Sequence, residues 1–178
     1  MEVLLGVSGS ISAYKAADIV SALKKRDIDT HVVMTKHATA FITKLTLQAL
    51  SQNEVYVDVL DEPDPDHIAH IALPQKVSVF CLAPASANVI AKIAHGIADD
   101  QLTSMVLALP SSTSRLIAPA MNTQMLENPA TRANIAILKE RGWSIIPSRV
   151  TRLACGVEGD GALAKVEDIV EAIITSVQ

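Results

Sequence analysis

Short, almost wholly apolar runs alternate along the chain with longer segments in which apolar residues recur every three or four positions. A run of four to eight apolar residues between turn signals is typical of a buried strand, and the longer spacing is that of a helix. The predicted strands are residues 2–7, 30–35, 77–83, 115–119 and 143–146, with a shorter run at 55–59. The predicted helices are residues 12–26, 36–50, 86–95, 100–109, 129–141 and 166–177.

This alternation predicts an α/β fold, because strands that are apolar at every position are buried on both faces. We expect a three-layer sandwich with a mostly parallel central sheet, formed as a single domain over residues 1–178. No internal repeat and no linker interrupts the pattern. In such sheets ligands bind outside the carboxyl ends of the strands. A functional site is therefore expected among the residues that follow each strand.

The composition excludes several classes of function. Of the 178 residues, 49% are hydrophobic but only 3% aromatic, so small aliphatic side chains must fill the core. The net charge is −4 and no basic run occurs, which argues against a nucleic-acid partner. Neither a signal peptide nor a membrane-spanning run is visible, and we expect a cytoplasmic protein. Cys81 and Cys155 are not spaced as a disulfide framework or a zinc site, so no metal is expected.

Hydroxyl-bearing residues follow the first two long strands. Gly9 and Ser10 lead directly into a helix, whose free N–H groups could hold a phosphate or a carboxylate. An ordinary turn capped by serine explains the same residues, and the run lacks the last glycine of the dinucleotide fingerprint. Thr35 follows the second strand and could meet a phosphate or cap a helix.

Two further segments after strands offer neutral polar groups. Ser86, Ala87 and Asn88 open a helix, where small side chains let a flat ligand approach the backbone, although Ser86 could equally be a helix cap. Asn122 lies between Met121 and Met125, which suits an apolar pocket with one oriented hydrogen-bonding group. The alternative at Asn122 is a turn in which the side chain bonds its own backbone.

Two further segments, which do not directly follow the strands discussed above, carry reactive side chains. His67 and His70 are three residues apart and could share a helical face, so one of them could act as a general base. A surface position is the simpler interpretation of His67. Cys155 lies in "TRLACGVEGDGA" (151–162), where three glycines fall within six positions. That density of glycine predicts a bendable loop carrying a thiol rather than a packed core.

Five segments, taken together and in this order, resemble the cysteine-decarboxylating flavoprotein family. They are "SGSISAYK" (8–15), "HIAL" (70–73), "PASAN" (84–88), "PAMNTQM" (119–125) and "LACGVEGDGALA" (153–164). The resemblance covers essentially the whole chain and implies a Rossmann-like or flavodoxin-like sandwich. Two departures are Leu126, where the family often has an aromatic residue, and Val89, where it often has threonine.

The resemblance also implies a set of site residues. It implies FMN bound by Gly9, Ser10, Ile11, Thr35, Ser86, Ala87, Asn88 and Ala120. It selects His70 over His67 as the catalytic histidine, and it makes Asn122 and Met125 substrate-binding residues. Cys155 becomes the catalytic proton donor, carried on a flap that closes over the substrate.

The implied reaction is the FMN-dependent decarboxylation of 4′-phosphopantothenoyl-L-cysteine to 4′-phosphopantetheine in coenzyme A biosynthesis. The flavin first takes electrons from the cysteine moiety, carbon dioxide then leaves, and the enethiol is reduced again. The alternatives are a peptidyl-cysteine decarboxylase of lantibiotic maturation, which stops at the enethiol, a flavin prenyltransferase, and a non-catalytic flavin-fold regulatory subunit. The resemblance implies a homotrimer or dodecamer with FMN near the subunit interfaces. The chain is too short to include the ligase that makes the substrate, which is expected on another polypeptide.

Overall fold

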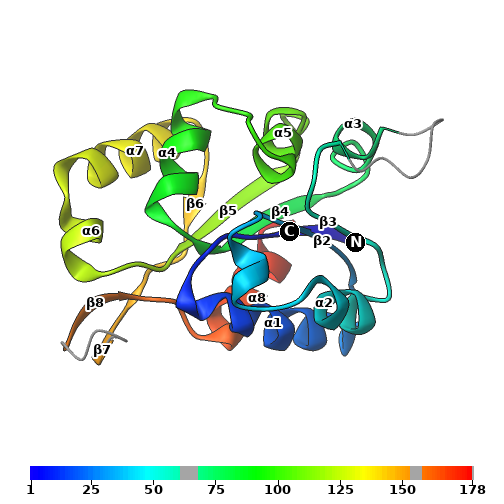
Figure 1. Cartoon of the computed structure of the whole chain (residues 1–178), viewed down its shortest axis with the longest axis horizontal. Coiled ribbons are helices and arrows are strands. Elements are labelled where there is room, and N and C mark those ends of the chain that lie inside the picture. Colours follow the sequence, from blue (N-terminus) through cyan, green and yellow to red (C-terminus); the bar gives the residue numbers. More distant parts are fainter. Residues whose placement is uncertain (61–67, 153–157, 178) are drawn as a thin grey trace.

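A parallel six-stranded sheet forms the centre of the computed structural model, which describes residues 1–60, 68–152 and 158–177 (Figure 1). The strand order is β3-β2-β1-β4-β5-β6, and every neighbouring pair is parallel. The strands are β1 (Glu2–Val7), β2 (Asp29–Met34), β3 (Val55–Tyr56), β4 (Val79–Ala85), β5 (Ser114–Pro119) and β6 (Ser144–Ile145).

Helices cover both faces of this sheet and complete three layers (Figure 1). One face carries α1 (Lys15–Lys24), α2 (Lys44–Ser51) and α8 (Val166–Thr175). The other carries α3 (Ala69–Ala72), α4 (Ala87–His95), α5 (Gln101–Leu107) and α7 (Pro129–Glu140). The short α6 (Thr123–Glu127) follows β5, and 3-10 turns η1 (Ile11–Tyr14) and η2 (Ala38–Ala40) follow β1 and β2.

The strands are buried on both faces, as their apolar sequences predict. Along β4, Val79 and Cys81 pack into the core beneath α1 and α8, whereas Phe80 packs into the core on the opposite face. The Phe80 ring meets Trp143 edge to face, with centroids 5.8 Å apart. Two cores of small aliphatic residues therefore hold the three layers together. Among the described residues, no helix is both long and apolar enough to cross a membrane.

The strand order is that of the Rossmann fold, which decides between the two topologies that the sequence left open. The order reverses between β1 and β4, and a crevice opens at such a point in α/β sheets. Ser8, directly after β1, is buried there; its hydroxyl donates to the Pro84 carbonyl (2.7 Å) and accepts from the Ser86 amide (2.8 Å). This one side chain fixes the loop after β1 against the loop after β4.

Several predicted boundaries differ from the structure. The predicted helices 12–26 and 36–50 each begin as a 3-10 turn before the α-helix proper. The predicted strand 77–83 runs on through Pro84 to Ala85, which pairs with Pro119 across a register irregularity. The predicted strand 143–146 is reduced to two residues.

The largest correction concerns the glycine-rich segment, expected as a loop. Strands β7 (Arg149–Arg152) and β8 (Glu158–Ala162) pair antiparallel, while residues 153–157 lie outside the described residues. Gly161 has a φ of +122° and its carbonyl accepts a 2.9 Å hydrogen bond from the Met121 amide. A Cβ there would overlap the Met121 carbonyl oxygen. This glycine therefore serves close packing of β8 against the segment after β5.

Candidate functional site

Two adjoining cavities open at the carboxyl edge of the sheet. The first, of about 1020 Å³, is lined by residues after β1, β4 and β5, by the β7–β8 hairpin and by the start of α8. The second, of about 910 Å³, is lined by residues after β2, β3 and β4 and by the start of α5. Gly9, Ser86, Ala87 and Met125 line both cavities. The residues at the strand reversal thus form a common wall between the two cavities.

The loop after β1 forms part of this common wall. Ser10 caps the following turn, because its hydroxyl oxygen accepts a hydrogen bond from the Ser12 amide (3.3 Å). A Cβ on Gly9 would lie 2.6 Å from the Cβ of His37, so the loops after β1 and β2 approach too closely for any larger residue. The three residues Gly9, Ser10 and Ile11 all line the first cavity. The resemblance had grouped them as cofactor-binding residues.

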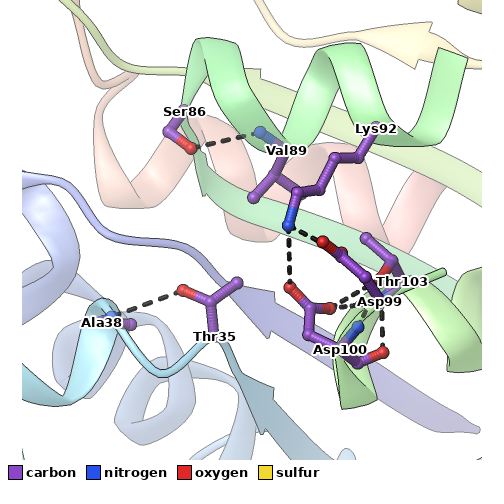
Figure 2. Close-up of polar contacts among 8 residues, drawn as sticks. All are labelled: Thr35, Ala38, Ser86, Val89, Lys92, Asp99, Asp100 and Thr103. Atoms are coloured by element: carbon purple, nitrogen blue, oxygen red, sulfur yellow. Dashed lines mark hydrogen bonds and ion pairs between the residues drawn. The ribbon is translucent and has the colours of Figure 1, made fainter. Parts of the chain in front are cut away.

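Thr35 joins the second cavity from the end of β2. It is buried, its amide donates to the Val7 carbonyl (3.0 Å), and its hydroxyl oxygen accepts from the Ala38 amide (3.3 Å; Figure 2). This bond closes a turn onto the first residue of η2, whose N-cap is His37, so Thr35 is not itself the cap. Thr35 does border the second cavity.

At the start of α4, residues also combine local hydrogen bonds with a place on the cavity wall. Ser86 is the N-cap, and its hydroxyl oxygen accepts from the Val89 amide (3.4 Å; Figure 2). Ala87 lines both cavities and Asn88 lines the second. Ala120, after β5, lines the first cavity and donates its amide to the Ala85 carbonyl (3.0 Å). All the predicted cofactor-binding residues therefore border one or both cavities.

A charged cluster on the wall of the second cavity was not predicted. The Lys92 ammonium lies 2.7 Å from Asp99 Oδ1 and 3.7 Å from Asp100 Oδ2 (Figure 2). The hydrogen bond to Asp99 raises the pKa of Lys92, and the same bond lowers the pKa of Asp99. Asp100 also caps α5 by accepting from the Thr103 amide (2.8 Å). Aspartate is a favoured N-cap residue, so the sequence does show a capping signal at Asp100.

Gln101 is a further residue that sequence reasoning missed. It is completely buried and lines the second cavity. Among the described residues, neither its Oε1 nor its Nε2 has a hydrogen-bond partner. A buried glutamine cannot be read from a helical pattern, in which this position resembles any other polar residue.

The segment after β5 places Asn122 on the first cavity. Asn122 caps α6, since its Oδ1 accepts from the Gln124 amide (2.8 Å), as the turn alternative anticipated. The Thr123 hydroxyl donates to the Asp160 carbonyl (2.5 Å), which ties this segment to β8. Met125 is 49% exposed and faces the space shared by the cavities.

Of the two proposed catalytic residues, the structure describes only His70, and it does not line this site. His70 is half-buried on α3 and belongs to the lining of neither cavity. In Figure 1, α3 and α6 lie at opposite ends of the molecule. Cys155 and His67 lie outside the described residues. The described part of the chain also contains no group of three or more His, Cys, Asp and Glu residues placed to hold a metal ion.

The strand order and the crevice define a Rossmann-type α/β protein whose site is walled by small and hydroxyl-bearing residues. The family described as Flavoprotein matches residues 1–178, and the chain belongs to this family. It is 51% identical over 172 residues to a probable phosphopantothenoylcysteine decarboxylase of Streptococcus mutans, covering 97% of this chain and 96% of that one. It is 44% identical over 169 residues to the coenzyme A biosynthesis bifunctional protein CoaBC of Bacillus subtilis, covering 95% of this chain but 41% of that protein.

Solved structures agree with the fold. A PPC decarboxylase mutant complexed with pantothenoylaminoethenethiol superposes with a TM-score of 0.87 at 32% identity, covering 98% of this chain and 96% of that one. The FMN-dependent cysteine decarboxylase SpaF superposes with a TM-score of 0.84 at 31% identity, covering 100% and 98%. The α/β fold class and the family expected from the sequence are confirmed.

Proposed function

We propose that this chain is an FMN-dependent phosphopantothenoylcysteine decarboxylase, which converts 4′-phosphopantothenoyl-L-cysteine to 4′-phosphopantetheine in coenzyme A biosynthesis. The observation that supports this function best is the shared crevice. Residues from "SGSISAYK", "PASAN" and "PAMNTQM", far apart in the sequence, border one continuous site. The chain that builds this crevice is 51% identical to a probable enzyme of that name over nearly the full length of both.

The residues that line the two cavities fit FMN. Gly9, Ser10 and Ile11 would hold it at the start of η1, and Thr35 would contribute from β2. Ser86, Ala87, Asn88 and Ala120 would leave room for a flat ring, because alanine and serine occupy little of the cavity. The buried amide of Gln101 also calls for a polar ligand. FMN, when bound, supplies a reversible two-electron store, which the substrate needs because the carbon that loses its carboxylate has no electron sink.

Asn122 would orient the substrate carboxylate. The cap to the Gln124 amide fixes the side chain with its Oδ1 toward α6. The Nδ2 end of an amide is its donor end, and a carboxylate is an acceptor. Met125 would pack against the apolar part of the substrate. In this arrangement Asn122 would hold the carboxylate at the wall of the first cavity.

His70 would act as the base or proton manager at the thiol end of the substrate. Because it borders neither cavity of its own chain, we infer that a neighbouring copy supplies it. A homotrimer or dodecamer with the site at the subunit interface would provide that copy. This chain spans about two-fifths of the length of its bifunctional CoaBC relatives.

Cys155 would deliver the final proton. A free thiol has a pKa of about 8.5, so near neutral pH it holds a proton that it can donate. The strands on either side of residues 153–157 belong to the hairpin that packs against the Asn122 segment. A reaction that ended at the enethiol would need no such donor.

The Cys155→Ser variant tests this assignment. It should release carbon dioxide but form no 4′-phosphopantetheine, and its flavin absorbance should stay bleached after one turnover. Mass spectrometry of the products and a visible spectrum provide the two measurements. Full formation of the reduced product by this variant would show that another group donates the proton.

A further inference from the structure

One polar side chain on the wall of the second cavity has no hydrogen-bond partner among the described residues. Gln101 opens α5, is completely buried, and borders the cavity. Both polar atoms of its amide lack a partner among the described residues. Buried side-chain polar atoms in folded proteins are nearly always hydrogen-bonded, so this pair requires an explanation.

The surrounding structure holds Gln101 in place without satisfying it. The Asp100–Thr103 capping box fixes the first turn of α5, and Lys92 braces Asp100 from α4. One turn further along the helix, the neighbour of Gln101 is the buried Met105, which offers no hydrogen-bonding group of ordinary strength. Gln101 therefore lies in the wall of the second cavity with an amide that no described protein group pairs with.

The chemistry of the amide restricts the ligand. Oε1 only accepts and Nε2 only donates, so a ligand that satisfies both must carry a donor and an acceptor side by side. A phosphate dianion offers acceptors alone, so it could pair with Nε2 but not with Oε1. The neutral parts of FMN carry both kinds of group. The imide edge of the ring has an N–H between two carbonyls, and the ribityl chain has hydroxyls.

We propose that Gln101 recognises FMN by pairing its buried amide with a neutral donor-and-acceptor group of the cofactor, on the ring edge or the ribityl chain, and not with the phosphate. The inference rests on the proposed function, because it takes FMN as the occupant of the crevice. It adds a positioning residue to the cofactor site that none of the quoted motifs contains. In this arrangement the free protein carries an unpaired amide that the cofactor satisfies.

The test compares the affinity of flavins for the wild-type apoprotein and for Gln101→Met, which keeps the length of the side chain and removes both polar atoms. One good hydrogen bond corresponds to about a tenfold change in Kd. The variant should therefore bind both FMN and riboflavin about tenfold more weakly, as measured by quenching of flavin fluorescence. Gln48→Met is the matched control, because Gln48 is exposed on α2 and borders neither cavity. It should bind both flavins like wild type.

The thermal stability of the apoprotein gives a second readout. Here the substitution should raise the Tm, whereas it should weaken flavin binding. Removing an unpaired buried amide should raise the Tm of the apoprotein by about 2–4 °C. Gln101→Leu should behave like Gln101→Met in both measurements. Lower apoprotein stability in both variants would show that the amide has a protein partner, and would overturn the proposal.

The affinities give three clear outcomes. Equal weakening for FMN and riboflavin supports the proposal; a changed flavin midpoint potential then assigns the contact to the ring edge, and an unchanged one to the ribityl chain. Unchanged affinity, or weakening for FMN alone, overturns it while leaving the proposed function intact. A wild-type apoprotein that binds no flavin would instead refute the proposed function.

Discussion

Burial decides the chemistry of Cys81. Its thiol lies within β4 with no exposed surface, and burial raises its pKa from 9.0 to about 12. The unfolded chain loses this proton near pH 9 and the folded chain only near pH 12, so unfolding is increasingly favoured as the pH rises across that interval. Cys81 is therefore a packing residue, and the proposed proton donor is the other cysteine of the chain, Cys155.

Alkylation of the native protein tests this difference. In a Cys155→Ser background, Cys81 should not react with iodoacetamide at pH 8, because the thiolate is the nucleophile and burial suppresses it. The same thiol should react fully in denaturant. Mass spectrometry of the intact chain measures both states. Rapid modification of the native variant would contradict the burial described here.

Single residues show where sequence reasoning reaches its limit. Ser86 and Asn122 could be named as site residues because they directly follow strands, and ligands bind at that edge of an α/β sheet. Gln101 could not be named, because its importance comes from complete burial and from the lack of a partner. Both features depend on how α5 packs over the sheet.

At the scale of elements, the hairpin β7–β8 depends on the absence of a side chain at Gly161. An alanine there would have to adopt a left-handed backbone and overlap the Met121 carbonyl. We expect Gly161→Ala to lower the free energy of unfolding by roughly 2–4 kcal/mol, from strain and lost packing together. It should also raise the KM for the substrate, because β8 supports the segment that carries Asn122.

Gly96→Ala is the matched control. Gly96 also has a positive φ, of +69°, but a Cβ there would meet nothing within 4 Å. Its substitution should cost about 1 kcal/mol, from the left-handed backbone alone, and leave KM unchanged. Urea denaturation and steady-state kinetics measure both variants. Equal effects of the two substitutions would show that the contact with Met121 has no importance of its own.

The strands of the central sheet were predictable and the hairpin was not, for a physical reason. Buried parallel strands need apolar residues at every position, which makes β1 and β4 visible in the sequence. β8 reads Glu-Gly-Asp-Gly-Ala and has neither an apolar run nor an alternating pattern. It is instead positioned by hydrogen bonds, in which the Thr123 hydroxyl donates to the Asp160 carbonyl and the Met121 amide donates to the Gly161 carbonyl.

At the scale of the whole molecule, the strand order depends on contacts between segments far apart in the sequence. The alternation of strands and helices allows either a Rossmann or a flavodoxin order, and only pairing of β1 with both β2 and β4 decides between them. That pairing creates the crevice. His70 borders neither cavity of its own chain, so the proposed site would draw this residue from a second copy.

A subunit-mixing experiment tests this expectation. His70→Asn and Asn122→Asp should each be inactive alone, and the aspartate keeps the oxygen that caps α6. Random equal mixing should restore about one quarter of wild-type activity, because each interface site draws one residue from each of two chains. Activity is assayed after co-expression of the two differently tagged variants and isolation of the mixed oligomers. No recovery would place both residues in the site of a single chain.

The central claim is that this crevice holds FMN and uses it to decarboxylate and then fully reduce the cysteine end of its substrate. The most direct measurement is to incubate the purified, FMN-saturated protein with 4′-phosphopantothenoyl-L-cysteine and to quantify carbon dioxide and 4′-phosphopantetheine together. The account predicts equal amounts of the two products over many turnovers, with the flavin oxidised at the end. A folded, FMN-saturated protein that releases no carbon dioxide, or one that accumulates the enethiol instead of 4′-phosphopantetheine, would contradict it.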